Sequence, residues 1–457
     1  MSNAIFTELT KNAETATKEI MKTVSAIVDE NSFVETDKFI CGNTDLGEAV
    51  GEGVVGGFAH IFDVRVGLFA TNPKVLKGSI GKANAKKIVK IIDSSVKAGL
   101  PVVAVLDTQG ARFGEGIDAM EGYAEIFAAL SDAYGIVPTV TAVKGADYGL
   151  SSYFCAVSDL CVAFAGAQIA TSSPLILAGN GKDDPAKICT GKLLGETSDV
   201  VTNVVANEKE LKTVISSFLS AVTEPVKQTA DNPNRTAKAA ALKKCDDMLK
   251  EIFDANSKFA VREGFAKEVY TGFARMDGIA VGYVAVDGKL TKEGAGKITE
   301  LLNTCESFSL PVINLVNCDG AESSSASDGA TIRAVSDMMF TFNSLSVPKL
   351  ALVYGNAIGL GYTAFAAKSN VDYSVAWTDA KIGTVSGEAA AQLLYADEIS
   401  KAKNKAQAAA KLATAYAEEN LLAPAVAKKG YLDNVIEPAL SRPYLIAALQ
   451  TFMSKEH

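Results

Sequence analysis

Two glycine-bearing turns hold the residues that are best placed to do chemistry in this chain. The first, residues 144–152, reads KGADYGLSS, and the second, residues 355–362, reads GNAIGLGY. Each turn follows an apolar run typical of a buried strand and precedes small residues typical of a helix. Backbone amides at the start of a helix have no intrahelical acceptor and lie at the positive end of the helix dipole, so such a turn could stabilise an oxyanion.

A single glycine between a strand and a helix is more often a simple turn than a site. Here, however, the two turns belong to a divergent duplication of the chain. An offset of 210 residues holds without a gap from Leu100-Pro101 and Leu310-Pro311 to Gly149-Leu150 and Gly359-Leu360. An offset kept over about 50 residues indicates two homologous domains, so the two turns are equivalent positions of one fold.

The order of elements in each half is strand, helix, strand, glycine-bearing turn, helix, strand. This order predicts a layered α/β unit with right-handed crossovers, repeated twice. We expect a helical segment over residues 1–52, an N-terminal domain over 53–222 and a C-terminal domain over 241–457. The polar segment 223–240, with two prolines, has the composition of an exposed linker.

Composition excludes several classes of function. The net charge of -9 argues against a nucleic-acid partner, because phosphate contacts need a basic face. We expect a cytoplasmic protein, since no apolar run approaches the roughly 20 residues that span a bilayer and no signal-peptide core is present. With only His60 and His457, a serine-histidine triad or a histidine metal site is almost excluded. The seven widely spaced cysteines are expected to be free thiols, with no metal bound.

Two further turns in the first half could meet an anion. In residues 107–112 (DTQGAR), the amides of Gly110 and Ala111 and the side chain of Arg112 could face one; alternatively, Arg112 pairs with Asp107 or Glu115. The turn Lys77-Gly78-Ser79 precedes a helix and could cradle a phosphate.

Several segments carry distinctive motifs. They are residues 107–116 (DTQGARFGEG), 122–127 (GYAEIF), 347–349 (VPK), 375–377 (VAW) and 430–438 (GYLDNVIEP), followed by Arg442-Pro443. From about Gly53 onward the chain resembles the carboxyltransferase subunits of biotin-dependent acyl-CoA carboxylases and decarboxylases. Their family motifs are DSGGAR-x-x-EG, GY-x-EIF and a closing GY-(V/I)-D-x-(V/I)-IEP.

The resemblance implies two tandem crotonase-type (ClpP-like) β-β-α superhelix domains, assembled into dimers and commonly into hexamers. It implies an acyl-CoA substrate with coenzyme A mostly on the first domain, and biotin on the second domain of a partner subunit. Because the chain has no biotin-attachment motif, biotin would sit on a separate carrier protein; biotin carboxylase or a membrane decarboxylase subunit is a further candidate partner. Biotin itself would take the α-proton of the substrate.

Carried over by position, the amides that stabilise the thioester enolate and the ureido oxygen belong to Gly149, Leu150, Gly359 and Leu360. The implied cofactor-binding residues are Gly78, Ser79, Gly110, Ala111, Arg112, Tyr148, Ile358, Gly361 and Tyr362.

Some positions depart from the family. Leu150 and Leu360 stand where a second glycine is usual, and a leucine resists positive φ and fills space near the ligand. Lys77 and Gln109 also replace glycines, and Thr363 stands where many propionyl-type enzymes have an aspartate. The acyl group and the direction of transfer, carboxylation or decarboxylation, therefore stay open.

Two alternatives to this function remain. One is a biotin-independent crotonase-type acyl-CoA hydratase or isomerase, for which Glu115 and Asp147 are the available carboxylates. The other is a non-catalytic scaffold paralogue, which the two leucines would favour.

Overall fold

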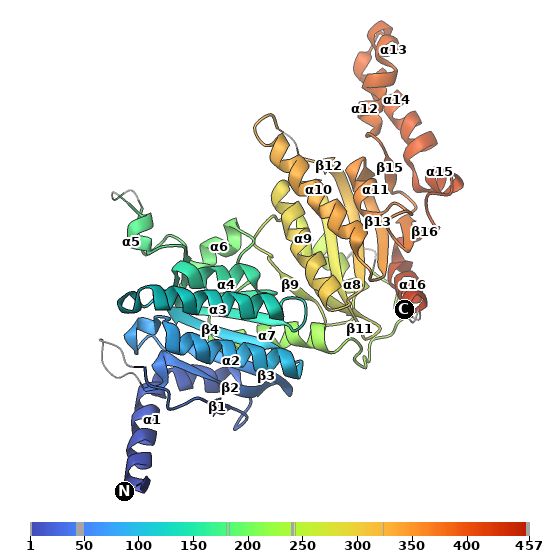
Figure 1. Ribbon diagram of the computed structural model, residues 1–457. Coiled ribbons are helices and arrows are strands. Elements are labelled where there is room, and N and C mark those ends of the chain that lie inside the picture. The colour runs from blue at the N-terminus through green and yellow to red at the C-terminus, as the bar shows by residue number, and fades with distance from the viewer. Residues whose placement is uncertain are drawn as a thin grey trace. The chain divides into compact units, whose positions relative to one another are not determined.

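The computed structural model describes residues 2–42, 50–179, 181, 183–238, 242, 244–322 and 324–453. The chain forms two compact units, Met1–Ser220 and Ala221–His457. Among the described residues, each unit has one eight-stranded sheet with helices packed on it (Figure 1). The α/β class predicted from the sequence is confirmed.

The sheet of the first unit has the strand order β1-β2-β3-β4-β5-β6-β8, with β7 beside β5. Strands β1 to β3 are antiparallel neighbours, and the sheet is parallel from β3 onward. The strands are β1 (Val34–Thr36), β2 (Val54–Ile61), β3 (Val64–Thr71), β4 (Val102–Thr108), β5 (Thr139–Tyr148), β6 (Leu160–Phe164), β7 (Gln168–Ala170) and β8 (Asn203–Val205).

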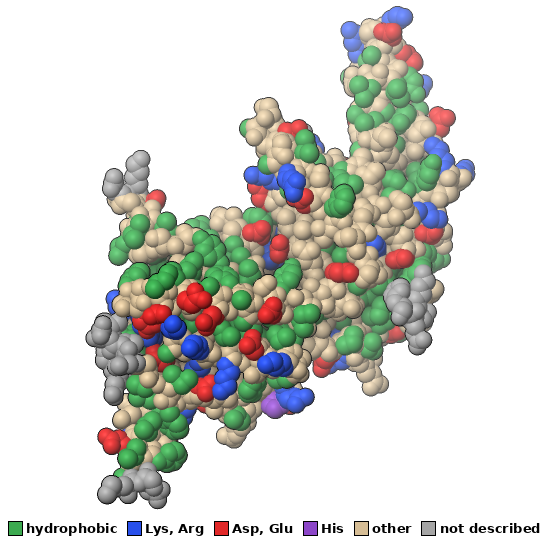
Figure 2. Space-filling view, viewed as in Figure 1, with side chains coloured by type: hydrophobic (Ala, Val, Ile, Leu, Met, Phe, Trp, Pro, Cys, Tyr) green, Lys and Arg blue, Asp and Glu red, His purple; other side chains and the backbone are tan. Residues whose placement is uncertain are grey.

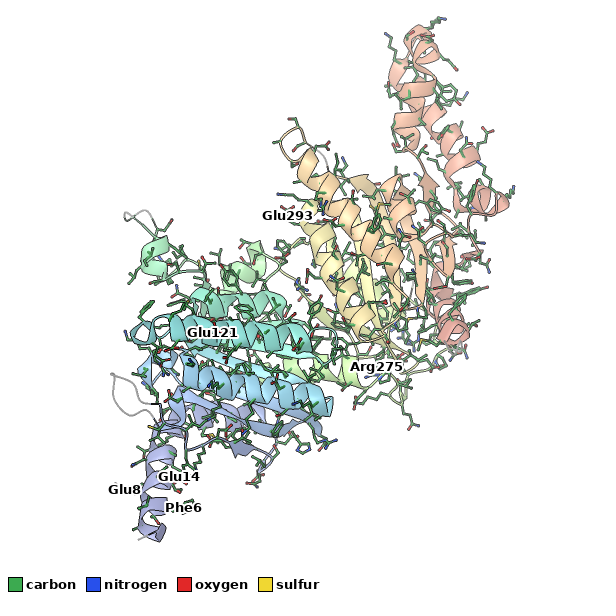
Figure 3. The ribbon with its side chains drawn as sticks, in the orientation of Figure 1. Phe6, Glu8, Glu14, Glu121, Arg275 and Glu293 are labelled. Atoms are coloured by element: carbon green, nitrogen blue, oxygen red, sulfur yellow. The ribbon has the colours of Figure 1, made fainter. Side chains whose placement is uncertain are left out.

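The helices of this unit include α2 (Lys82–Ala98) and α3 (Ile117–Ala133), which lie side by side on one face of the sheet (Figure 1). The long helix α1 (Ser2–Ile27) is held by the ring of Phe6 against Phe39, with centroids 6.1 Å apart, and by Glu14, whose carboxylate lies 3.7 Å from the Lys38 ammonium (Figure 3). The remaining helices are α4 (Ser152–Val157), α5 (Pro174–Leu177), α6 (Gly191–Thr197) and α7 (Glu208–Thr223).

The second unit repeats this sheet strand for strand. Its order is β9-β10-β11-β12-β13-β14-β16, with β15 beside β13. The strands are β9 (Phe259–Val261), β10 (Val269–Met276), β11 (Ile279–Leu290), β12 (Val312–Ala321), β13 (Lys349–Ile358), β14 (Tyr373–Trp377), β15 (Lys381–Gly383) and β16 (Asn434–Ile436). The helices are α8 (Cys245–Ile252), α9 (Lys292–Ser307), α10 (Asp328–Ser344), α11 (Leu360–Phe365), α12 (Gly387–Leu394), α13 (Ala396–Lys401), α14 (Lys405–Tyr416), α15 (Ala423–Lys428) and α16 (Ser441–Met453).

The duplication extends to the packing of helix on sheet. A Cβ built on Gly67 would lie 1.9 Å from the Ser95 hydroxyl of α2, and a Cβ on Gly282 would lie 2.2 Å from the Cys305 thiol of α9. Each unit therefore needs a glycine in its second long strand so that the first long helix can approach the sheet.

Two of the expected segments contain more structure than the sequence indicated. Residues 1–52 hold a strand, β1, which pairs with β2, in addition to the helix α1. Residues 223–238 pack on the second unit by specific contacts, because Val226 bridges to Ile279 and Asp231 binds Arg235 and the Ala255 amide.

No described helix has both the length and the apolar composition that a membrane crossing requires. None of the seven cysteines, all of them described, is in a disulfide, as predicted; Cys41 is exposed, Cys189 is half-buried and the others are buried.

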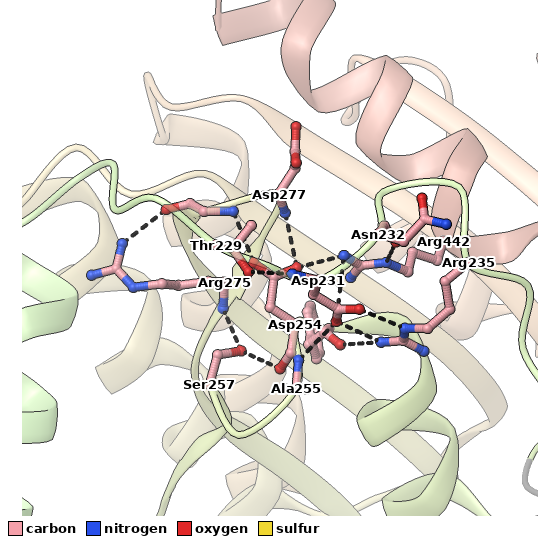
Figure 4. A network of polar contacts seen from close by, with 12 residues as sticks. Thr229, Asp231, Asn232, Arg235, Asp254, Ala255, Ser257, Arg275, Asp277 and Arg442 are labelled. Atoms are coloured by element: carbon pink, nitrogen blue, oxygen red, sulfur yellow. Dashed lines mark hydrogen bonds and ion pairs between the residues drawn. The ribbon is translucent and has the colours of Figure 1, made fainter.

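The pair Arg442-Pro443 lies at the start of α16 and anchors this helix to the rest of the second unit (Figure 4). The Arg442 guanidinium is fully buried, 2.6 Å from an Asp254 carboxylate oxygen, and also donates to the Ile252 carbonyl at 2.8 Å. Asp254 in turn accepts from the amides of Asp277 and Gly278, at 3.0 and 2.8 Å. One arginine thus ties together segments that are almost 200 residues apart in the chain.

We expect Arg442→Ala to lower the free energy of unfolding of the second unit by about 3–5 kcal/mol, because it leaves the buried Asp254 carboxylate without its cation. The single tryptophan, Trp377, can report the loss, since its indole N–H donates to the Ser441 hydroxyl beside Arg442 at 2.8 Å. Arg333→Ala is the control, because Arg333 is an exposed partner of Asp337. If the two variants unfold at the same midpoint concentration of the denaturant guanidinium chloride, this account is contradicted.

Candidate active site

A change of register between parallel strands builds the turn that follows β5. Leu106 of β4 lies opposite Val143 of β5, but Thr108 lies opposite Asp147, so β5 carries two extra residues. The second unit has the same bulge, since Val316 lies opposite Val353 and Cys318 opposite Ala357.

The side chain at the centre of each bulge holds the extra backbone. Asp107 accepts a hydrogen bond from the Ala146 amide at 3.1 Å, and Asn317 accepts one from the Asn356 amide at 2.8 Å. A Cβ on Gly145 would lie 2.4 Å from the Asp107 carboxylate, and a Cβ on Gly355 would lie 2.3 Å from the Asn317 amide oxygen. The glycine and the polar side chain therefore require each other, and together they aim the strand end.

The first turn leads from β5 into a short 3-10 helix, Gly149–Ser151, and then into α4. Gly149 has φ +76°, whereas Leu150 has an ordinary negative φ. The left-handed position thus falls on the glycine, and leucine causes no backbone strain at the next position. The amides of Gly149 and Leu150 begin the 3-10 helix, where they have no intrahelical acceptor.

A cleft of about 770 Å³ opens in front of this turn. Its lining contains one charged residue, Lys77, and no acid, histidine or cysteine among the described residues. Apolar side chains gather at its edge, over α5 and the neighbouring helices (Figure 2). The lining residues are Lys77, Gln109, Gly110, Ala111, Phe113, Met120, Tyr148, Gly149, Leu150, Gln168, Thr171, Ser172, Ser173, Pro174, Leu175, Ile176, Pro185 and Ala186.

Five of the residues predicted for this site therefore meet at one cleft: Gly110, Ala111, Tyr148, Gly149 and Leu150. Sequence reasoning missed Gln168, whose side-chain oxygen accepts from the Tyr148 hydroxyl at 3.0 Å. The Gln168 amide nitrogen donates to the carbonyls of Pro185 and Ile188, at 2.7 and 3.0 Å, and so fixes the far wall. No motif marks this glutamine, which begins β7, the second strand after the predicted turn and helix.

The structure gives the amides of Gly78 and Ser79, which were predicted to cradle a ligand, other partners. Their amides donate to the carbonyls of Val75 and Leu76, at 2.9 and 3.0 Å, so neither amide is available to a phosphate. A Cβ on Gly78 would lie 2.2 Å from the Asp107 carbonyl. This glycine serves close packing beneath the cleft, and Lys77 reaches the cleft in its place.

The prediction that the Arg112 side chain faces an anion is also corrected. Its guanidinium is buried and binds the carboxylates of Glu52 at 2.7 Å and Glu115 at 2.8 Å. Of the alternative partners expected for Arg112, Glu115 is one, Asp107 is not, and Glu52 was unforeseen. Glu115 also accepts from the Lys82 amide at 2.7 Å, which uses this carboxylate to cap α2.

The second turn has the same shape with a different set of free amides. Gly359 has φ +53°, and its N–H donates to the Gly383 carbonyl at 2.7 Å, so this amide is not available to a ligand. Leu360 begins α11, where its amide has no intrahelical acceptor. The predicted donor pair of the second unit is thereby reduced to Leu360.

Of the residues around the second turn, one lines a cavity and two hold the turn in place. Ile358 lines a cavity of about 370 Å³ together with Lys381, Ser386 and Glu388. Gly361 is buried, and a Cβ there would lie 2.7 Å from the Cys318 carbonyl. The Tyr362 hydroxyl donates to the Tyr431 carbonyl at 3.2 Å, which connects the turn to the GYLDNV motif.

Asp147 lies directly behind the first turn and not in the cleft. Its side chain is fully buried, the Cys155 thiol donates to its Oδ2 at 3.4 Å, and its Oδ1 has no hydrogen-bond partner among the described residues. Burial raises the pKa of this carboxyl to about 7, and the Ser151 hydroxyl and Cys155 thiol offset part of that effect. Asp147 and Glu115 thus do not form a pair of carboxylates facing a substrate.

Comparison with known proteins decides the family. The model of the carboxyl transferase domain matches residues 11–457. The chain belongs to the carboxyl transferase domain family. The family resemblance noted from the motifs is confirmed.

Relatives are similar over almost the whole chain. A propionyl-CoA carboxylase carboxyltransferase subunit from Haloferax mediterranei is 29% identical to this chain. The alignment covers 94% of this chain and 90% of the relative. A methylmalonyl-CoA decarboxylase alpha subunit from Veillonella parvula is 28% identical, over 94% of this chain and 89% of its own. A transcarboxylase 12S structure with methylmalonyl-coenzyme A bound superposes with a TM-score of 0.89 and 25% identity, covering 96% of this chain and 89% of the other. The predicted fold of duplicated crotonase-type domains is confirmed.

We expect Asp107→Ala to lower the free energy of unfolding of the first unit by about 1–3 kcal/mol, because it leaves the bulged Ala146 amide without its acceptor. Asp107→Asn should lose less, since an asparagine does this work at position 317. Calorimetric unfolding of the full chain checks this, and equal losses in the two variants would refute the role of the acceptor.

Asp147 should make the first unit less stable as the pH rises. Its folded pKa of about 7 lies above the unfolded value of about 3.9, so its stabilising contribution is complete below pH about 4 and is lost as the pH rises to about 7. The loss in wild type relative to Asp147→Asn should reach at most about 4 kcal/mol. Urea unfolding followed by circular dichroism at several pH values measures it, and parallel pH profiles would exclude it.

Proposed function

We propose that the protein transfers a carboxyl group between biotin and an acyl-CoA, as the carboxyltransferase subunit of a biotin-dependent carboxylase or decarboxylase. The observation that carries this proposal is the cleft of the first unit, which Gly149 and Leu150 line and whose described lining contains no acid or histidine. Named relatives that act on propionyl-CoA and methylmalonyl-CoA support it.

The Gly149 and Leu150 amides would bind the thioester oxygen as negative charge develops there. Such donors are fixed by the backbone, so they need no reorganisation during the reaction, and loss of one typically costs about 10²–10³ in kcat. Gly149 has no atom within 4 Å of the place where a Cβ would stand, so the ligand side of the turn is open. The Leu150 side chain lines the cleft and packs partly against the core, which supports an open turn.

The rest of the cleft fits a coenzyme A thioester. Its apolar edge, with Phe113 and Ile176 exposed by 91% and 71%, suits the pantetheine and acyl chains. Lys77 is the charged group of the lining and would meet a phosphate. Its backbone φ of +56° is rare for a residue with a side chain and aims it at this place.

The lining also separates this function from a hydratase or isomerase of the same fold. Those reactions need side-chain carboxylates in the pocket, whereas Glu115 caps α2 and Asp147 is buried behind the turn. When bound, biotin on its carrier would supply the carboxyl group and take the α-proton, or, in the reverse direction, accept the carboxyl group and return the proton. The chain itself then only has to bind the thioester and hold its oxyanion.

We infer that biotin meets the second unit, where Leu360 offers an amide and Ile358 lines the neighbouring cavity. The carrier is a separate protein, and biotin carboxylase or a membrane decarboxylase subunit would complete the complex. A homo-oligomer of two to six copies is inferred, because the transcarboxylase 12S neighbour is a hexamer and exposed apolar side chains surround the first cleft.

Replacing the leucines tests the proposed donors. Leu150→Pro and Leu360→Pro remove the two amides at helix-start positions that tolerate proline, and each should reduce carboxyl transfer by about 10²–10³-fold. Leu150→Ala and Leu360→Ala are the matched controls, since they shorten the side chain and keep the N–H. Transfer is measured with labelled carboxyl groups between a biotin carrier and acetyl-, propionyl-, crotonyl- and malonyl-type thioesters.

Two outcomes would reject this function. If wild type transfers no carboxyl group with any of these thioesters in either direction, and no biotinylated partner co-purifies, the assignment falls. If folded proline and alanine variants have equal rates, the amides are not the donors.

A further inference from the structure

A small polar cluster lies behind the Gly149 turn, inside the core of the first unit. It consists of Asp147, Tyr123 of α3, Ser151 of the 3-10 helix and Cys155 of α4, all of them buried. Asp147 Oδ1 and the Tyr123 hydroxyl have no hydrogen-bond partner among the described residues. Buried polar atoms of this kind are costly, so their presence at the back of a proposed catalytic turn needs an explanation.

The duplication shows that the fold does not require this cluster. At the offset of 210, Asp147 corresponds to Ala357, Ser151 to Gly361 and Cys155 to Phe365. The bulge, the positive φ of the glycine and the helix start are the same in the second unit without these polar groups. The polar cluster is therefore an addition to the first turn alone.

Ser151 connects the cluster to the main chain of the turn. Its hydroxyl donates to the Tyr148 carbonyl at 3.2 Å. That carbonyl belongs to the same planar peptide group as the Gly149 N–H, so holding the oxygen fixes the direction in which the N–H points. On its other side the Tyr148 oxygen packs on Gly110, where a Cβ would lie 2.6 Å away.

We propose that Asp147 is a positioning residue for the Gly149 amide, acting through Ser151, and that its neutral form is the one that supports the turn. When Asp147 is protonated, it attracts donors less strongly than a carboxylate does, and the Ser151 hydroxyl can remain on the Tyr148 carbonyl. When Asp147 is ionised, its unpartnered oxygen draws the Ser151 hydroxyl away, and the peptide group loses its support. The catalytic part of this inference rests on the proposed function.

The groups that face Asp147 make it the one that changes charge near neutral pH. Burial raises the pKa of Tyr123, and the Cys161 thiol of β6, together with burial, raises the pKa of Cys155. Thr108, opposite on β4, is a hydroxyl that accepts from the Gly110 amide. No Lys, Arg or His is among the described groups that shift the pKa of Asp147. Asp107, one residue from Thr108, binds the Ala146 amide instead and is unchanged in the variants below.

The first measurement is the pH profile of carboxyl transfer by the complete protein. In wild type, kcat should fall about tenfold as the pH rises from about 6 to about 8.5, with little change in KM, because the donor acts on the developing charge. Asp147→Asn, which cannot ionise, should remove this fall. Adding Ser151→Ala to both proteins should abolish the difference between wild type and Asp147→Asn. Profiles of wild type and Asp147→Asn that coincide would overturn the proposal.

The second measurement does not depend on activity. Hydrogen exchange of the full chain is followed for residues 148–153, with residues 358–363 as an internal control that lacks an acid beneath it. After correction for the chemical rate, exchange at 148–153 should rise about tenfold over the same pH range in wild type and not in Asp147→Asn. If wild type transfers no carboxyl group at all, the proposed function fails, and this exchange experiment still decides the role of Asp147: equal protection in the two proteins overturns it.

Discussion

The register change between two parallel strands is the constraint on which each unit depends. Two extra residues in β5 and in β13 leave an amide that the sheet cannot satisfy, and Asp107 and Asn317 satisfy it. Glycine is required opposite them, because a Cβ at Gly145 or Gly355 would collide with these side chains. This one hydrogen bond to the bulged amide sets the direction of the strand end. The positions of the following glycine and of the helix start depend on that direction.

One fold then carries two differently equipped turns. In the first unit Gly149 and Leu150 line a cleft of about 770 Å³, whereas in the second unit the Gly359 amide donates to the Gly383 carbonyl. The backbone conformation at both glycines is left-handed, so the difference arises from the next segment of chain and not from the turn itself. Duplication preserved the frame and let each ligand surface diverge.

The sequence was sufficient for features that depend on regular spacing. Its constant offset predicted the repeated sheet, and the order of apolar runs predicted the turns after β5 and β13. Contacts between segments distant in the chain could not be predicted: Arg112 finds Glu52, 60 residues earlier, and Gln168 forms the wall beside Tyr148. The acceptors of the Gly78 and Gly359 amides could not be predicted either, because a motif shows where a glycine stands but not which carbonyl its amide binds.

A main-chain donor is hard to adjust, because substitution at its own position either keeps the N–H or, with proline, removes it altogether. What can change is the hold on the carbonyl of the same peptide group, since the peptide is planar and rotates as a unit. In the first unit that hold belongs to Ser151 and Gly110, and Asp147 lies behind them with an oxygen that lacks a partner among the described residues. The second unit has Ala357 and Gly361 at these positions, and its peptide group is held instead through the Gly359 N–H, which donates to the Gly383 carbonyl. When a site depends on backbone amides, its two copies can therefore diverge through the residues beneath the turn.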